Sequence, residues 1–286
     1  MRPCPVCHAD RSIPYCVHKG ISFIRCRNCK SIFQETPPDW STLATIYQGD
    51  YHLRRGHSGD AALEAVKRAT TADYLRLIER RSPPGKRLLE LGCSAGASLE
   101  AAAELGWIAQ GIELSPEAAD VARQRSGGLP VHTGTLLDAP IDPGSCDVIA
   151  LFDVIEHIDP PEDTIRAISQ ALAPGGLVLM VTPDAGSLSA ATMKSRWPHL
   201  FQEHVIIYSR EGLARLLMRF GLVIERVGFA WKRVNLNMLV RHATIHPHVA
   251  FGGIVRLLGK VMPGFLQTAM IPFNIGEFYI IARKPA

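Results

Sequence analysis

Strand-like and helix-like segments alternate from about residue 86 to residue 184, and this alternation constrains the fold more than any other feature of the sequence. Short apolar runs such as KRLLELG, WIAQGIEL and CDVIALFD are typical of buried parallel strands. Helical segments follow them; in SPEAADVARQRSGG, Ser115 suits the N-cap and Pro116 the first helical position. The pattern predicts an α/β fold in which a parallel sheet is covered by helices on both faces.

Changes in composition divide the 286 residues into three predicted parts. Residues 1–35, rich in Cys, Pro and Arg, form a small N-terminal unit, and residues 36–85 combine a Pro-rich linker with an amphipathic helix. Residues 86–286 form the sheet domain, with a helical insertion near residues 236–275 that mixes apolar and basic residues. We expect this insertion to pack in the core or to form a lid over the site; it could instead form a dimer contact or touch a membrane-bound lipid substrate.

The composition disfavours some classes of protein. A formal charge of +4 permits an anionic substrate, but the sequence lacks the Lys/Arg stripe found in many nucleic-acid binders. No apolar signal-peptide core follows Met1, so we expect a cytoplasmic protein with reduced cysteines. No uncharged apolar run reaches the roughly 20 residues of a membrane span, so no transmembrane segment is predicted. Peripheral membrane contact and the oligomeric state stay open.

The first strand of the predicted sheet ends in LLELGCSAG, which has the character of a ligand-binding turn. Ligands of open α/β sheets bind at the carboxyl ends of the strands, and small residues from Gly92 to Gly96 let the backbone approach a ligand closely. Glu90, inside the strand end, suits an ammonium group. Glu113 follows at the spacing of an acid that accepts hydrogen bonds from ribose hydroxyls. A dinucleotide-binding domain that has lost a glycine is the alternative.

Four motifs, in order, resemble those of class I S-adenosylmethionine (SAM) dependent methyltransferases. LLELGCSAG is similar to their first motif, GIELSPEA to their ribose-binding acid motif, and FDVIEHI and LAPGGLVLMVTPD to their fourth and fifth strand regions. The resemblance implies a Rossmann-like, mainly parallel seven-stranded sheet, SAM as cofactor and methyl transfer as the activity.

The resemblance also assigns roles to residues of the cofactor site. Beside Glu90, the residues that would wrap the methionine part are Gly92, Cys93, Ser94 and Gly96. Glu113 and Leu114 would hold the ribose, and Asp153 would border the methyl donor. The family often places an acid after the position of Gly134, where this chain has Thr135. The resemblance therefore implies adenine recognition by backbone groups around Thr135 and Leu136.

Two CxxC pairs in the N-terminal unit predict a metal site. Cys4 and Cys7 form one pair, and Cys26 and Cys29 form the other, about 20 residues later. Four thiolates at this spacing are typical of a structural zinc ribbon, and a closed four-sulfur site leaves no position for catalysis. Unligated thiols are the alternative. We expect the ribbon and the sheet domain to have separate structural supports.

Two histidines are candidates for the acceptor side, where proton removal would accompany methylation. His157 follows Glu156 after the fourth strand, and His204 follows Glu203 in WPHLFQEHVIIYS. This second segment is similar to one in sugar-nucleotide C-methyltransferases, whose His acts as the base. The resemblance suggests His204, with Glu203, at the acceptor site, and His157 is a further candidate. Backbone support is the alternative role for each histidine.

Three hypotheses for function follow. The first is a SAM-dependent methyltransferase that modifies a small-molecule or glycan (sugar-derived) acceptor, because the fuller resemblance is to zinc-ribbon methyltransferases of glycan synthesis. The second is an RNA base methyltransferase whose ribbon holds RNA, against which the lack of a concentrated basic face counts. The third is a non-catalytic module that binds SAM or a partner. Tyr47 and Tyr51 could cap the site or serve in packing.

Overall fold

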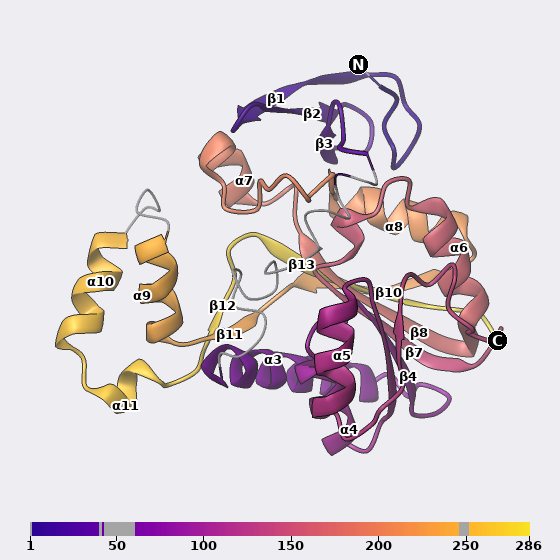
Figure 1. Ribbon diagram of the computed structural model, residues 1–286. Coiled ribbons are helices and arrows are strands. Elements are labelled where there is room, and N and C mark those ends of the chain that lie inside the picture. The colour runs from indigo at the N-terminus through magenta and orange to yellow at the C-terminus, as the bar shows by residue number, and fades with distance from the viewer. Residues whose placement is uncertain (1, 40–41, 43–60, 246–251) are drawn as a thin grey trace.

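The apolar runs of the sequence form one central sheet, which Figure 1 shows as arrows between two groups of helices. The computed structural model describes residues 2–39, 42, 61–245 and 252–286, and within them this sheet has seven strands. Their order across the sheet is β10 (Val223–Phe229), β13 (Glu277–Arg283), β8 (Leu172–Pro183), β7 (Cys146–Phe152), β4 (Arg87–Leu91), β5 (Ile108–Glu113) and β6 (Val131–Thr133). Among these strands β13 runs antiparallel to both of its neighbours, β10 and β8, and the other pairs of neighbours are parallel. The predicted seven-stranded, mainly parallel sheet is confirmed.

Helices cover both faces of the sheet because its strands are apolar on both sides. In β7, Ile149 and Leu151 pack with residues of α6 and α8, whereas Val148 and Ala150 pack with residues of α3, α4 and α5. The helices that follow one another up to the last strands are α3 (Ala61–Glu79), α4 (Ala97–Glu104), α5 (Pro116–Arg125), α6 (Glu162–Ala171), α7 (Leu188–Met193) and α8 (Arg210–Arg219), with short 3₁₀ turns η1 (Ile155–His157) and η2 (Lys194–Arg196). The predicted N-cap is confirmed: Ser115 Oγ accepts a hydrogen bond from Ala118 N.

The N-terminal unit forms a second, antiparallel sheet, drawn in indigo in Figure 1. Its order is β1 (Ser12–His18), β2 (Ile21–Cys26), β3 (Ile32–Gln34) and β9 (Ile206–Ile207). The fourth strand comes from the sheet domain, with Ile32 opposite Ile207. Phe33 and Ile24 belong to the same apolar core as Leu213 of α8. The expectation of separate structural supports is therefore wrong, since so small a unit cannot bury these side chains alone.

A helical hairpin projects between β10 and β13 and stands away from the central sheet in Figure 1. Its root is the antiparallel pair β11 (Lys232–Val234) and β12 (Ile271–Phe273). Its helices are α9 (Leu236–Ile245), α10 (Gly252–Val261) and α11 (Gly264–Gln267). Among the helices of the described residues, none has the length and apolar character that a membrane crossing requires. Tyr47 and Tyr51, like residues 246–251 of the predicted insertion, lie outside the described residues.

Candidate cofactor and acceptor site

The turn after β4 is built so that only glycine fits at two of its positions. Gly92 and Gly96 have φ angles of +72° and +83°. A Cβ on Gly92 would lie 2.5 Å from Val154 Cγ2, and one on Gly96 would lie 3.0 Å from Ala122 Cα. Both the backbone angle and the close neighbours exclude a side chain. The turn therefore allows close backbone packing at the carboxyl end of β4, where the sequence predicts a ligand.

Glu113, the last residue of β5, ties this turn to the start of α5. One carboxylate oxygen accepts a hydrogen bond from Ser94 N at 2.8 Å, and the other accepts one from Ser115 N at 2.9 Å. Leu114, which follows Glu113, is half-buried. Cys93 packs against β5, since a Cβ on Gly111 would lie 2.6 Å from its sulfur. The structure thus brings the predicted ribose acid next to the predicted methionine turn.

Glu90 is buried within β4 and has a perturbed carboxyl group. Burial raises the pKa of Glu90 to about 7, although the hydrogen bond from Ser98 and the charge of Lys67 lower it. Ser98 Oγ donates to this carboxylate, with distances of 2.5 and 2.7 Å to its oxygens. Lys67 lies on α3, and sequence reasoning missed it because the cofactor motifs begin 20 or more residues later. A buried carboxyl that ionises near neutral pH is suited to hold a cation.

The predicted adenine side contains an acid that the sequence motif did not reveal. Thr135 N donates a hydrogen bond to Asp138 Oδ1 at 2.9 Å, and a Cβ on Gly134 would lie 2.6 Å from the same oxygen. Asp138 thus folds back beside Gly134, close to where the family often has its acid. Leu136 is buried in the core cluster that includes Leu89. The contact of adenine with backbone groups of Thr135 and Leu136 stays a prediction.

Asp153 directly follows β7, has a left-handed φ of +57°, and lies against a cation from a distant segment. Lys232 Nζ is 2.7 Å from Asp153 Oδ2 and 2.7 Å from Glu277 Oε1. Burial opposes ionisation of Asp153, but the charges of Lys232, His199 and His157 lower its pKa below the ordinary value. Asp153 Oδ1 is buried and has no hydrogen-bond partner among the described residues.

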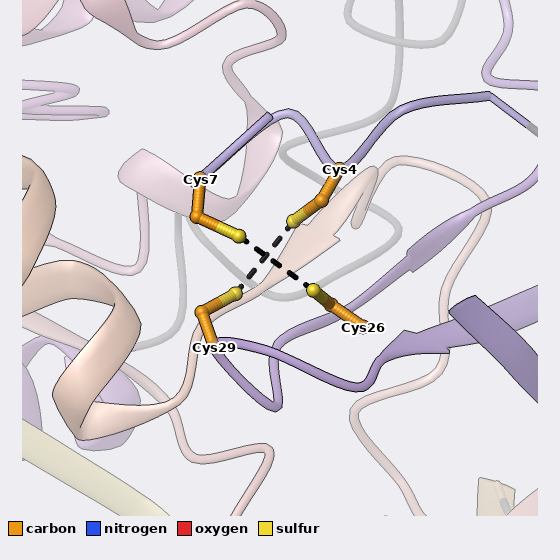
Figure 2. Close-up of side chains that lie close together, drawn as sticks. All are labelled: Cys4, Cys7, Cys26 and Cys29. Atoms are coloured by element: carbon orange, nitrogen blue, oxygen red, sulfur yellow. Dashed lines mark hydrogen bonds between the residues drawn. The ribbon is translucent and has the colours of Figure 1, made fainter. Parts of the chain in front are cut away.

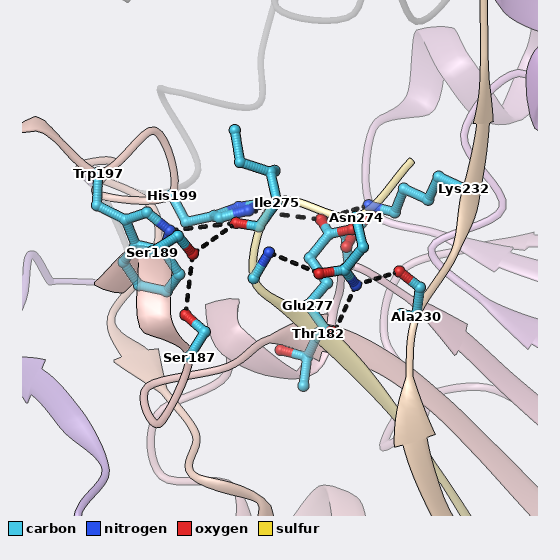
Figure 3. Close-up of polar contacts among 12 residues, drawn as sticks. Thr182, Ser187, Ser189, Trp197, His199, Ala230, Lys232, Asn274, Ile275 and Glu277 are labelled. Atoms are coloured by element: carbon cyan, nitrogen blue, oxygen red, sulfur yellow. Dashed lines mark hydrogen bonds and ion pairs between the residues drawn. The ribbon is translucent and has the colours of Figure 1, made fainter. Parts of the chain in front are cut away.

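Lys232 and Glu277 form a charged cluster with His199, which Figure 3 shows beside the start of β13. His199 Nε2 lies 3.7 Å from Glu277 Oε1. Burial raises the pKa of Glu277 to about 7, while Lys232 lowers it. Asn274 fixes the geometry, since its side-chain amide donates to the carbonyl oxygens of Ala230 and Glu277. The sequence offered no local signal for this cluster, whose members come from three separate loops and strand ends.

The side chains of His157 and His204, the two histidines predicted for the acceptor site, are in contact. The ring centroids of His157 and His204 are 4.8 Å apart, and the rings lie edge to face. His157 Nδ1 is 2.9 Å from the carbonyl oxygen of Glu203, and His204 Nδ1 is 2.8 Å from that of His199. A carbonyl oxygen only accepts, so each Nδ1 carries a proton, and in the neutral form of each ring the lone pair is on Nε2. Glu203 acts on His157 through its backbone, while its own side chain is buried.

Glu156 joins this pair and was not predicted as a site residue. Ligand atoms of Glu156, His157 and His204 all lie within 4.8 Å of one another. Thr182 Oγ1 donates to Glu156 Oε2 at 2.9 Å, whereas Oε1 is buried with no partner among the described residues. Burial raises the pKa of Glu156 well above its ordinary value, and Asp153 raises it further. A carboxyl group beside two imidazoles can relay a proton or hold a divalent cation.

The four predicted metal ligands, Cys4, Cys7, Cys26 and Cys29, converge in the N-terminal unit, as Figure 2 shows. The Sγ–Sγ distance is 3.6 Å for Cys4–Cys29 and for Cys7–Cys26. Thiolates around zinc, at about 2.3 Å from the metal, lie about 3.8 Å apart, whereas a disulfide is about 2.05 Å long. The hydrogen bond from Cys4 lowers the pKa of Cys29 to about 5. The cluster is consistent with a zinc ribbon.

Known proteins are similar to this chain in sequence. The family model described as a methyltransferase domain matches residues 63–227. The ubiquinone biosynthesis O-methyltransferase of Xanthomonas campestris pv. campestris (strain B100) is 36% identical over 115 residues, which cover 38% of this chain and 47% of that protein. The mitochondrial protein of the same name from Schizosaccharomyces pombe is 27% identical over 132 residues, 43% of this chain and 48% of that protein. The chain spans about half the length of the curated relatives it matches.

Solved structures share the fold. A SAM-dependent methyltransferase from Archaeoglobus fulgidus is 15% identical, with a TM-score of 0.52, and the match covers 76% of this chain and 94% of that one. Geranyl diphosphate C-methyltransferase from Streptomyces coelicolor A3(2) is 17% identical, also with a TM-score of 0.52, and covers 88% and 90%. At such identities the likeness extends to the fold alone.

Proposed function

The chain belongs to the methyltransferase domain family, and from this premise we propose that it transfers the methyl group of SAM to a small-molecule acceptor. One observation carries the proposal: a single edge of the sheet holds the Gly92–Gly96 turn, Glu113, Asp153 and the His157–His204 pair. Cofactor-type and acid–base groups therefore meet where an α/β sheet binds its ligands.

The residues of the cofactor half fit SAM in their chemistry. SAM supplies an electrophilic methyl group on a sulfonium, next to an amino-acid end and a ribose. Glu90 would face the ammonium and Glu113 the ribose hydroxyls. Asp153 Oδ1, a buried acceptor, would face the cationic centre. Asp138 would be available near the adenine, which the sequence motif alone did not suggest.

The acceptor half supports removal of a proton from a hydroxyl group. The curated relatives are named as O-methyltransferases, and this chain has two imidazoles whose Nε2 atoms can accept a proton. We assign the base to His204, and to His157 and Glu156 the positioning and relay of the proton. A sugar-derived hydroxyl satisfies the same chemistry as any other small-molecule hydroxyl.

The four-cysteine unit would hold a structural zinc ion away from the reaction. Its sulfur atoms are mostly buried, and its sheet pairs with β9 shortly after His204. The ribbon would thus brace the segment that carries the base. Four thiolates require a reducing compartment, so we place the protein in the cytoplasm.

An assay with methyl-labelled SAM tests the proposal. The full chain would be offered a panel of phenols, sugar nucleotides and, separately, total RNA. We expect label on a hydroxyl of a small molecule and none on RNA. Label on RNA alone would replace the proposal by the RNA hypothesis, and SAM binding without turnover on any acceptor would favour a non-catalytic role.

A further inference from the structure

Helix α10 of the hairpin exposes a continuous apolar stripe. Ile254, Leu257, Leu258 and Val261 follow the i, i+3, i+4, i+7 spacing of one helix face, and all are solvent-exposed; Leu257 and Val261 are 60% and 66% exposed. The opposite face packs on α9, where a Cβ on Gly259 would lie 2.6 Å from Val240 Cγ2. The stripe is thus the outward face of a packed hairpin.

Further apolar side chains of the hairpin are exposed outside α10. They are Leu266, Met270 and Ile271, on the way back to β12, and Trp231 at the root of the hairpin. The side chain of Gln267 donates to the carbonyl oxygens of Gly259 and Met262, which fixes the end of α10 relative to this return segment. Folded monomers seldom expose an apolar helix face such as that of α10 unless it binds something.

The charge of the hairpin has one sign. From Leu236 to Gly276 the sequence contains three Lys/Arg residues and no Asp or Glu. Two of the three, Arg256 and Lys260, lie on α10 with the apolar stripe. An apolar helix face with Lys and Arg on the remaining surface of the helix is typical of helices that lie in the headgroup region of a membrane.

We propose that the hairpin docks the protein on the surface of a membrane that contains anionic lipids, with α10 lying along the interface. A ten-residue helix is about 15 Å long, half the thickness of the hydrocarbon core, so α10 would lie on the membrane and not cross it. Charge complementarity selects the lipid surface over a second copy of the chain, because a symmetric contact would bring like charges together.

The root of the hairpin connects this surface to the candidate site. Lys232, the first residue of β11, is the cation that pairs with Asp153 at the end of β7. A docked hairpin would therefore hold the acceptor edge of the sheet near the bilayer. Membrane binding goes beyond the proposed function and is measured without methyl transfer, so either can fail alone.

The test is vesicle flotation with the full chain. Vesicles of phosphatidylcholine alone would be compared with vesicles that contain about 25% phosphatidylglycerol, at about 0.1 M and about 1 M salt. We expect binding to the anionic vesicles at low salt and loss of much of it at high salt. Equal binding to both vesicle types, or none to either, would overturn the proposal.

Two matched pairs of variants locate the surface. Leu257→Ser should weaken vesicle binding about tenfold, whereas Ile108→Ser, at a 71%-exposed position at the start of β5, should leave it unchanged. Lys260→Glu should weaken it about 30-fold, whereas Arg80→Glu, the same change of charge at the end of α3, should have little effect. Equal effects on vesicle binding within either pair would overturn the assignment to α10. The proposal would also fail if the protein did not bind vesicles and formed a dimer that Leu257→Ser dissociates.

Discussion

The imidazole rings of His157 and His204 pack edge to face with centroids 4.8 Å apart, although one follows β7 and the other precedes β9. Backbone carbonyls at 2.9 and 2.8 Å accept hydrogen bonds from the two Nδ1 atoms, so in the neutral form of each ring the lone pair is on Nε2. Two rings with the same tautomer, beside the buried carboxyl of Glu156, form a site at which a proton can be taken up and passed on.

Replacing His204 tests this assignment. His204→Ala should lower turnover by about 10²–10⁴, the range for a positioned base, and leave SAM affinity nearly unchanged. The pH–rate profile should lose the limb that the base produces. His18→Ala, at a half-buried ribbon histidine outside the candidate site, is the control and should retain full turnover. Full turnover in well-folded His204→Ala would transfer the role to His157.

Lys232 should matter more for stability than a surface lysine. Lys232→Met leaves the carboxylates of Asp153 and Glu277 without their shared cation, so we expect a loss of about 3 kcal/mol in unfolding free energy at pH 8. The loss should shrink near pH 5, because Glu277, with a pKa of about 7, is protonated there. Lys86→Met, which breaks an exposed pair with Glu79, should cost about 1 kcal/mol or less. Urea titrations at the two pH values would measure this, and equal losses would contradict the account.

Glu90 should make the protein without cofactor less stable as the pH rises. Its pKa of about 7 in the folded protein exceeds the ordinary 4.5, so the unfolded chain ionises first as the pH increases between these values. The unfolding free energy should fall by about 3 kcal/mol across this window. Glu90→Gln should lack this slope and be more stable than the parent at pH 8 but similar at pH 4. Parallel stability profiles of the two proteins would show that Glu90 is not perturbed.

The ribbon should contain one zinc ion per chain, and its loss should affect the whole molecule. Metal analysis of protein purified without chelator should find close to one equivalent, and Cys26→Ser should abolish it. Because Phe33 shares the core with Leu213, Cys26→Ser should lower the melting temperature of the entire chain. Cys16→Ser, outside the cluster, is the control. Far less than one equivalent of zinc, or an unchanged melting temperature, would contradict this.

The parts of the fold that the sequence predicted are those that depend on local patterns. The buried strands around Glu90 and Val148 have continuous apolar runs. The turn at Gly92 has a positive φ and no room for a Cβ atom, which the glycine in the sequence indicates. The parallel strands β4, β5, β7 and β8 followed from these signals, whereas the number of seven strands followed from the family resemblance.

The parts that could not be predicted depend on contacts between distant segments. The pairing of Ile32 with Ile207, which joins the ribbon to the sheet domain, has no local signature. The same holds for Lys232 beside Asp153. Asp138 is only a few residues from Gly134 in the sequence. Its side chain lies beside Gly134 because of the conformation of the loop, and no motif indicates this contact. Long-range packing, and not propensity, decides each of these contacts.

Calorimetric titration of the purified chain with SAM, S-adenosylhomocysteine and NAD tests the central claim most directly. We predict that SAM and S-adenosylhomocysteine bind with one site per chain and that NAD does not bind. Glu113→Ala should weaken SAM binding by about 1–3 kcal/mol, because it removes the carboxylate that accepts hydrogen bonds from the ribose hydroxyls. Binding of NAD without binding of SAM would contradict the account.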